Sequence, residues 1–402
     1  MIKQIRIDQL KPGMHIHDLN CGWLDHPFLT GSFHVFDTAT VEKVANIGIR
    51  TLYIDTLKGA DVREAPTQAE VNADLERQLQ KIAEKKTDKP VIVTLKDEAA
   101  RARRLQGEAS KLVRSLMDDV RLGQQIQVDR VEPLVEGMVD SIFRNHDALL
   151  PLARLKHHDD YTFRHSVSVC ALLVAFGRGM KLERPVIKEM ALGGLLHDVG
   201  KARVSDRILN KPGKLSDEEF GHMQHHVDEG VRVLEQTPGI SRIAMQVTAE
   251  HHERFDGSGY PGHLAAERIS PYGQMASIVD VYDAITSERV YHKGMPPTLA
   301  LKKLLEWSGH HFDVQLVHAF IRSIGIYPSG SLVMLESKRL AVVVEQNEDK
   351  LLEPVVEVFY HTGQQHYIRP ELIDLALSQQ DRISNVESYE KWNIDPYQWL
   401  PG

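Results

Sequence analysis

The chain has 402 residues, of which 42% are hydrophobic and 26% are charged, and its formal net charge is −8. This length predicts two or three domains, each able to bury its own core. The acidic balance argues against a general nucleic-acid-binding protein, which would carry a basic surface. Cys21 and Cys170 fit no thiolate metal spacing and are typical of a reducing compartment. No apolar run approaches the ~20 residues of a membrane helix and the first residues do not resemble a signal peptide, so we expect a soluble cytoplasmic protein.

The first 65 residues predict a small α+β domain. The stretches IKQIRI, GMHIHDL and RTLYIDT alternate as strands do, and Pro12 and Gly13 mark a turn. DTATVEKVANIGI, between the last two stretches, is typical of a helix. Residues 66–96 are mostly polar, which predicts a linker or insertion that is partly helical.

Helical patterns fill the middle of the chain and strands close it. Apolar residues recur at three- and four-residue steps through 97–155, where Pro133 is expected to separate two connecting helices. Similar patterns continue through 156–328, interrupted by glycine and proline. Residues 329–402 contain alternating stretches that predict a short β-rich extension. The predicted fold is therefore mainly α, with a helical catalytic domain between a small α+β domain and a β extension.

Side chains of the type that bind metals gather in the helical region. His165 begins one apolar helix, and His197 and Asp198 end another, with Lys201 expected on the same helical face as His197. Unpaired polar groups are costly at the end of an apolar helix, which favours a functional role for this pair. Three later stretches, MQHHVDEG, AEHHERFDGSGYP and MASIVDVYDAITSERVYH, supply His225, His226, His251, His252, Asp280, Asp283, Arg289 and His292.

This mixture of histidine and aspartate points to a reactive metal site. Without cysteine, such a set suits iron, manganese, zinc or nickel. Five histidines and two aspartates from this set already exceed the ligands of one tetrahedral ion, and they match two ions that share a carboxylate. Two ions ~3.5–4 Å apart can hold a phosphate and a hydroxide for in-line attack, so the residues predict hydrolysis of a phosphoester. Any one of these histidines alone is more often a surface residue, and DGSGYPG alone is equally well a simple turn.

Six stretches, in order, resemble the HD-GYP family, a bacterial branch of the HD phosphohydrolases. They are YTFRHS, LLHDVGK, ILNKPGKLSDEEF, HHERFDGSGYPG, VDVYDAITSERVY and HHFDVQLVHAF. The resemblance implies an all-helical domain that hydrolyses the messenger cyclic di-GMP to pGpG, GMP or both. It implies two divalent metal ions, with iron or manganese preferred to zinc or nickel. The N-terminal stretches LKPGMHIHDLNCGWLDHPF and IGIRTLYIDT are similar to a small domain of unknown function that often precedes HD-GYP domains.

The resemblance also implies a role for each matching residue. The implied metal ligands are His165, His197, Asp198, His226, His251, His252 and Asp280, with Asp198 bridging the two ions. His226 is preferred to His225 because the family's ligand lies four residues before a glycine, here Gly230. Asp198 and Lys201 are the implied catalytic residues, and the substrate contacts would come from Lys201, Tyr260, Arg289 and His292. Glu253 is expected to support the site or to pair with Arg254 rather than to bind metal.

Three positions depart from the family pattern. Tyr161 stands where some members carry a glutamate that supports a third metal, so two ions are expected here. Val290 replaces a frequent proline, and His292 replaces a basic residue. A histidine is a weaker cation at neutral pH, which lowers the expected affinity for substrate.

Two other functions stay open at this point. One is a catalytically weak signalling module that acts through protein contacts, for example with GGDEF-domain proteins. The other is a phosphohydrolase of another cyclic dinucleotide, because the metal ligands do not read the base. The complete ligand set and Lys201 favour the active enzyme. The helices of 97–155 would also allow a homodimer.

Overall fold

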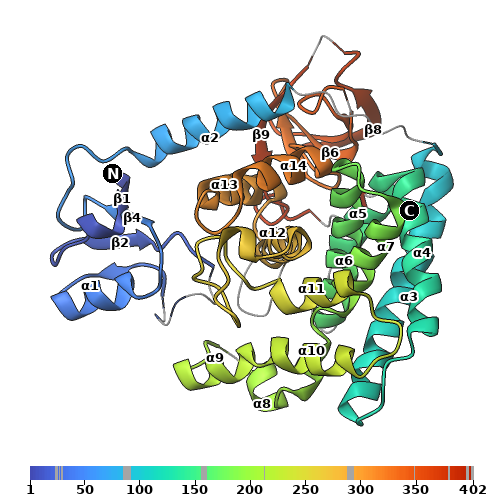
Figure 1. Ribbon diagram of the computed structural model, residues 1–402. Coiled ribbons are helices and arrows are strands. Elements are labelled where there is room, and N and C mark those ends of the chain that lie inside the picture. Colours follow the sequence, from blue (N-terminus) through green and yellow to red (C-terminus); the bar gives the residue numbers. More distant parts are fainter. Residues whose placement is uncertain are drawn as a thin grey trace. The chain divides into compact units, whose positions relative to one another are not determined.

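Figure 1 shows a computed structural model of the chain, which forms two compact units. One unit contains Met1–Leu79 and Asn210–Gly221, and the other contains Gln80–Leu209 and His222–Gly402. The structure describes all residues except 23–25, 27, 29, 85–91, 155–160, 212, 288–293, 348, 379–380, 395–397 and 400–402. The predicted fold class is confirmed, since most regular structure is helical, with a small sheet near the N-terminus and strands near the C-terminus.

The first unit is built on a four-stranded antiparallel sheet. In spatial order its strands are β1 (Ile2–Arg6), β4 (Thr51–Asp55), β2 (His15–Asp18) and β3 (Phe33–His34). Helix α1 (Thr38–Ala45) begins after Asp37, whose carboxylate accepts a hydrogen bond from the amide of Thr40 and so caps the helix. The turn predicted at Pro12 and Gly13 is present, with Gly13 at a φ of +90°.

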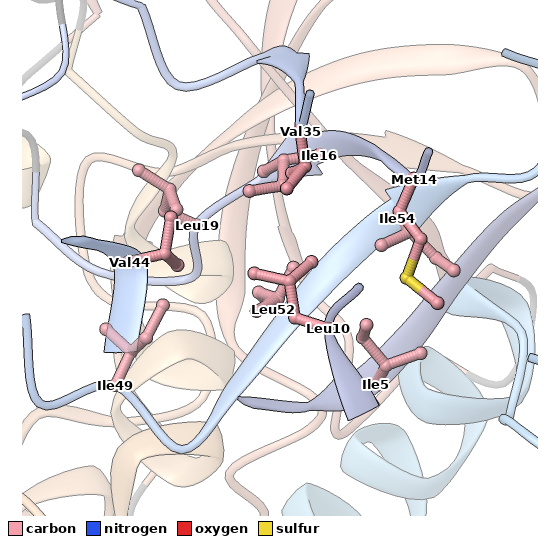
Figure 2. Close-up of a cluster of buried hydrophobic side chains, with 10 residues drawn as sticks. All are labelled: Ile5, Leu10, Met14, Ile16, Leu19, Val35, Val44, Ile49, Leu52 and Ile54. Atoms are coloured by element: carbon pink, nitrogen blue, oxygen red, sulfur yellow. The ribbon is translucent and has the colours of Figure 1, made fainter. Parts of the chain in front are cut away.

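Alternate residues of this sheet form a core of their own. Figure 2 shows Ile5 of β1, Ile16 of β2, and Leu52 and Ile54 of β4 together with Val44 of α1. Each of these five side chains is at most 1% exposed. Because side chains alternate across a strand, Leu52 and Ile54 of β4 point to the same face of the sheet and can share one core. The first unit therefore has its own apolar core, as an independent domain does.

Lys214 joins the segment Asn210–Gly221 to the rest of the first unit. Its ammonium lies 2.8 and 3.3 Å from the two ring nitrogens of His26. It also donates to the backbone carbonyl oxygens of His26 and Phe28. Burial and the nearby ammonium lower the pKa of His26 to about 4, so at neutral pH the uncharged ring can accept a hydrogen bond from Lys214.

The second unit begins with three helices that precede the predicted site. They are α3 (Leu95–Arg121), α4 (Val128–Arg144) and α5 (His146–Arg154), and α2 (Gln68–Ala83) leads into them from the first unit. Further along the chain come α6 (Tyr161–Gly179), α7 (Arg184–Leu196), α8 (Asp206–Leu209), α9 (Asp217–Gln224), α10 (His226–Glu235), α11 (Arg242–Glu250), α12 (Pro271–Thr286), α13 (Pro297–Trp307) and α14 (Val314–Ile324). Among the described residues, no helix is long and apolar enough to cross a membrane.

Helices α6 and α7 form the centre of this unit. Residues 165–176 of α6 and 190–200 at the end of α7 and just beyond it are buried almost without interruption. Helices α3, α4 and α5 pack on them, and Figure 1 shows these five helices side by side. A helix that is apolar on all sides is stable only in such a core, which places the end of α7 deep inside the unit.

The helix break predicted at Pro133 is wrong. Pro133 lies inside α4, and the chain changes direction earlier, between Arg121 and Val128. Gly123 lies in that connection with a φ of +81°, a conformation that glycine adopts easily and that commonly ends helices. Helix α4 continues through Pro133 because its buried face packs on both sides of the proline and outweighs the missing backbone hydrogen bond.

A five-stranded antiparallel sheet closes the chain, as predicted. In spatial order its strands are β8 (His366–Asp374), β7 (Val355–His361), β6 (Arg339–Glu345), β5 (Leu332–Leu335) and β9 (Ile383–Glu387). Apolar clusters cover both faces of its middle strands. Asp147 of α5 connects the helices to the sheet. Its carboxylate accepts hydrogen bonds from the hydroxyl of Ser329, before β5, and from the amide of Gln346, directly after β6.

A buried ion pair joins α3 to α4. The carboxylate of Glu98 is fully buried and accepts two hydrogen bonds of 2.8 Å from the guanidinium of Arg144. Arg101 contacts the same carboxylate at 3.1 Å. Burial by itself would raise the pKa of Glu98, but the hydrogen bonds from Arg144 lower it, so the carboxylate stays charged.

Replacing Glu98 tests how much this ion pair contributes to the free energy of unfolding. Glu98→Gln should lower the free energy of unfolding by about 1–3 kcal/mol, because Arg144 loses its charged partner in a buried setting. Urea unfolding measures the change. Glu108→Gln is the matched control: Glu108 faces Arg104 at 3.8 Å with 57% of its side chain exposed. The control should cost less than about 1 kcal/mol, and equal losses in both variants would contradict the prediction.

Candidate metal centre

Five helices bring the seven predicted ligands together inside the second unit. They are His165 on α6, His197 and Asp198 directly after α7, His226 at the start of α10, His251 and His252 directly after α11, and Asp280 on α12. All are buried except His252, whose side chain is 18% exposed. His225 is exposed directly before the first residue of α10 and lies outside the cluster. Arg289 and His292 fall outside the described residues.

Three of the histidines are oriented by helix ends. In each, ring atom Nδ1 lies next to the carbonyl oxygen of the residue three positions earlier: His197 with Gly194 at 2.8 Å, His226 with Met223 at 2.7 Å, and His251 with Thr248 at 2.8 Å. The last carbonyls of a helix lack partners within the helix, so they are free to accept a proton from Nδ1. With that proton on Nδ1, the lone pair of Nε2 is available to a metal.

The ligand atoms form three overlapping groups, each with ligand atoms within 4.8 Å of one another. The first is His165, His197 and Asp280, and the second is His226, His251 and His252. The third joins them, because it contains Asp198 with His197 of the first group and His251 of the second. Oδ2 of Asp198 lies 3.7 Å from Nε2 of His165 and 3.4 Å from Nε2 of His197. Oδ1 lies 3.4 Å from Nε2 of His226. The carboxylate of Asp198 therefore faces the first group with Oδ2 and the second group with Oδ1.

The unsatisfied atoms of this cluster fit a bound cation. Nε2 of His197 and Oδ1 of Asp198 are buried and have no hydrogen-bond partner among the described residues. A buried polar atom left without a partner costs about 1–3 kcal/mol. Divalent transition metals accept imidazole and carboxylate donors, so an ion placed here would satisfy both atoms. The residues present thus fit a metal site better than a closed hydrogen-bond network.

Local charges set the protonation states that metal binding needs. Burial alone would raise the pKa of Asp198, yet Lys201, whose Nζ lies 2.5 Å from Oδ2, and His197 hold it well below its usual value. Burial, followed by the charge of Lys201, lowers the pKa of His226 to about 4. Burial and His197 lower the pKa of His251 to about 3. At neutral pH the carboxylate is charged and these two rings are neutral, which are the forms that bind metals.

Lys201 lies beside the centre, but not on the helix where it was predicted. Helix α7 ends at Leu196, and a 3-10 turn, η3 (Val199–Arg203), follows, so Lys201 and His197 do not share a helical face. Instead Lys201 pairs with Asp198, three residues earlier. A β-carbon at Gly200 would lie 1.9 Å from the carbonyl oxygen of His226, so only glycine allows the turn to approach α10 this closely.

The GYP stretch forms a loop against His252. The amide of Tyr260 donates to the carbonyl oxygen of His252 at 3.1 Å, and the centroids of the two rings are 4.6 Å apart. The buried carboxylate of Glu253 accepts hydrogen bonds from the amides of Gly262 and Leu264 at 2.7 and 2.9 Å. Glu253 therefore holds the loop that carries Tyr260 beside a predicted ligand.

Asp283 and Ser168 belong to the centre, although neither residue has a role predicted from the sequence. Oδ2 of Asp283 lies 2.6 Å from Nδ1 of His165, and the hydroxyl of Ser168 donates to Oδ1. Both residues are fully buried. A spacing signal existed, because Asp283 follows Asp280 by three residues and Ser168 follows His165 by three, which puts each pair on one helix face.

The neutral histidines should make the metal-free protein sensitive to acid. The pKa values of about 4 for His226 and 3 for His251 lie below the ~6.5 expected in the unfolded chain. As the pH falls below ~6.5, the unfolded chain binds protons that the folded chain does not, so the free energy of unfolding falls. Each such ring contributes about 1.4 kcal/mol per pH unit in this range. The pKa of His197 is raised, so well below pH ~6.5 its ring is protonated in both the folded and the unfolded chain and does not reduce this loss.

Urea unfolding of chelator-treated protein at pH 7 and pH 5 measures this loss. His226→Gln removes one ring that titrates and should make the pH dependence shallower. A free energy of unfolding that stays constant over this range in the metal-free protein would contradict the assignment of neutral, buried rings.

Two family models match the chain. The model described as an HD domain matches residues 148–316, and that of a domain of unknown function (DUF3391) matches residues 2–131. The first match contains all seven residues of the cluster. The second covers the sheet of the first unit and extends through α2 and α3.

Individual proteins are also similar to the chain. A cyclic di-GMP phosphodiesterase of Pseudomonas aeruginosa is 42% identical over 396 residues, which cover 98% of this chain and 94% of that protein. The 3′3′-cGAMP-specific phosphodiesterase 2 of Vibrio cholerae is 39% identical over 31% of this chain and 24% of its own length. A solved structure of an HDG"Y"P protein from Bdellovibrio bacteriovorus, 18% identical, covers 80% of this chain and 98% of its own with a TM-score of 0.47.

Proposed function

Because the chain belongs to the HD-GYP family of cyclic di-GMP phosphodiesterases, we propose that it hydrolyses cyclic di-GMP at a centre of two divalent metal ions. The position of Asp198 is the observation that supports two ions. Its Oδ2 faces His165 and His197, and its Oδ1 faces His226 on the other side. A carboxylate in that position can bridge two ions, and a bridged pair is suited to phosphoester hydrolysis.

Each ion would have three ligands besides the shared carboxylate. The proposed sets are His165, His197 and Asp280 for one ion and His226, His251 and His252 for the other, with Asp198 between them. When bound, the ions lower the pKa of a water molecule and withdraw charge from the phosphate oxygens. The donor set accepts iron or manganese, with zinc and nickel as alternatives.

The residues around the ligands supply charge and position. Lys201 holds its ammonium beside Asp198 with 20% of its side chain exposed, so it can also reach a phosphate oxygen at the mouth of the site. A fixed positive charge there stabilises the charge that develops on the phosphate during attack. Tyr260 stands against His252 and would line the substrate site. Arg289 and His292 are the further proposed phosphate contacts.

A second candidate substrate is 3′3′-cGAMP. It is favoured by the similarity to the Vibrio cholerae enzyme, which covers 31% of the chain, whereas the similarity to the cyclic di-GMP enzyme covers 98%. The cluster of ligands would contact the phosphate and not the base, so it serves either nucleotide. The clustering of all seven proposed ligands argues against a catalytically weak module that acts only through GGDEF-domain proteins.

The domain limits belong to the same proposal. We place the N-terminal domain at 1–65, the insertion at 66–96, the connecting helices at 97–155, the catalytic domain at 156–328 and the β extension at 329–402. The match of the HD-domain model to 148–316 supports the fourth of these. A cytoplasmic location, and a homodimer through the connecting helices, stay predictions.

Turnover by the metal-loaded protein tests the proposed function. Protein reconstituted separately with iron, manganese, zinc and nickel is incubated with cyclic di-GMP, and pGpG and GMP are separated by chromatography. Product should form with at least one metal, and the His197→Ala/Asp198→Ala double variant should form none. The ratio of pGpG to GMP shows whether one or two bonds are cut.

Parallel reactions with 3′3′-cGAMP compare kcat/KM for the two substrates. A higher kcat/KM for 3′3′-cGAMP would make that nucleotide the substrate. A protein that contains metal but hydrolyses neither nucleotide would refute the proposal.

Lys201→Met separates the charge at the mouth of the site from the metal ligands. Loss of the ammonium should lower kcat by about 10²–10³-fold, because one preorganised charge on the reacting group is lost. Metal content, measured by elemental analysis, should stay unchanged. Lys188→Met is the control, since Lys188 is similarly exposed and pairs with Glu132 and Glu136 away from the centre. An unchanged kcat in Lys201→Met would remove this residue from the mechanism.

A further inference from the structure

His165 is held by a carboxylate, unlike the three histidines that helix ends orient. Its Nδ1 lies 2.6 Å from Oδ2 of Asp283, whereas the three others use backbone carbonyl oxygens. The reason lies in its position within α6. His165 is the fifth residue of a helix that runs to Gly179, and carbonyls inside a helix are already bonded to amides four residues later. A side chain from another helix must therefore supply the acceptor.

Asp283 is placed to supply it. The residue lies on α12, three positions after the predicted ligand Asp280, and its side chain is fully buried. Its other oxygen accepts a hydrogen bond from the hydroxyl of Ser168, on the same helix as His165. Two donors from α6 thus fix both oxygens of the carboxylate, and with them its rotation.

The two nitrogens of the His165 ring face different partners. Nδ1 points to Asp283, while Nε2 lies 2.9 Å from Oδ1 of Asp280 and 3.7 Å from Oδ2 of Asp198. The imidazole ring therefore separates Asp283 from the group of ligand atoms, and Asp283 is not part of any of the ligand groups formed by the described residues. It therefore acts on the centre through His165.

We infer that Asp283 is a positioning residue for the metal centre, which orients His165 with its proton on Nδ1 and its Nε2 lone pair toward the ion. The carboxylate also makes the ring a stronger donor, because a negative charge hydrogen-bonded to Nδ1 raises the basicity of Nε2. This inference rests on the proposed function, because it requires that His165 bind a metal.

Metal affinity in Asp283→Asn tests the inference. The amide keeps the size of the side chain but lacks the charge, and its NH2 group can turn toward His165 and favour the wrong ring tautomer. Metal-free wild type and variant are titrated with Mn²⁺ in competition with a chromogenic chelator. The dissociation constant for Mn²⁺ should rise by about 10- to 100-fold. With Mn²⁺ at saturation, the KM for cyclic di-GMP should change little, because Asp283 does not touch substrate.

Asp147→Asn separates this role from a purely structural one. Asp147 is also a buried carboxylate with two hydrogen-bond donors, Ser329 and Gln346, but it lies outside the ligand groups. Its replacement should lower the melting temperature and leave Mn²⁺ affinity unchanged. If Asp283→Asn behaves in the same way, with lower stability and wild-type affinity, the inference is wrong.

A second variant covers the case in which Asp283→Asn does not fold. Ser168→Ala removes one donor to the carboxylate and leaves its contact with His165, so the carboxylate can rotate. The variant should bind Mn²⁺ several-fold more weakly than wild type, and equal affinity would overturn the inference. Binding is measured without substrate, so its outcome is independent of turnover. A wild type that binds Mn²⁺ but hydrolyses no cyclic dinucleotide would refute the proposed function while leaving the role of Asp283 intact.

Discussion

Imidazole rings buried in an apolar helical core need an acceptor for the outer nitrogen of each ring, and much of the catalytic unit follows from this requirement. Helices α7, α9 and α11 each end just before a histidine, so the free carbonyls of their last turns receive the Nδ1 protons. Those same bonds turn the opposite nitrogens toward a common point. The lengths of these helices thus determine where the ligand atoms meet, and ring orientation needs no separate polar scaffold at these three positions.

Charge in the centre is balanced around a single carboxylate. Asp198 is enclosed by Lys201 and by histidines from three helices, and the pKa of this carboxyl is low because these neighbours outweigh its burial. Two atoms of the centre, Nε2 of His197 and Oδ1 of Asp198, are buried without a hydrogen-bond partner among the described residues, which lowers the stability of the fold. A bound ion would recover that free energy, so metal binding and folding are thermodynamically coupled in this unit.

Local sequence patterns identified what depends on local structure. The alternation of the first and last strands located both sheets, and the apolar periodicity located the helical region. The seven residues that lie together in the structure were implied by the resemblance of the motifs to a family, which periodicity alone does not supply. The helix break predicted at Pro133 was wrong because burial of the apolar face of α4 outweighs the low helix propensity of proline. The prediction that Lys201 and His197 share a helical face was wrong because it assumed that the helix continues past Leu196, where α7 ends. Asp283 received no role because its contact with His165 joins residues 118 positions apart in the chain.

The segment Asn210–Gly221 gives the chain an unusual order of assembly. It lies in sequence between Asp198 and His226, yet it belongs to the same compact unit as the first 79 residues. During synthesis from the N-terminus, the sheet that contains Ile5 and Ile54 can bury its core long before Lys214 leaves the ribosome. The first unit is then completed only while the catalytic unit is being made. A shortened chain that begins after residue 79 would keep this segment but lose His26 and Phe28, the partners of Lys214, so the two units are not separable by a single cut.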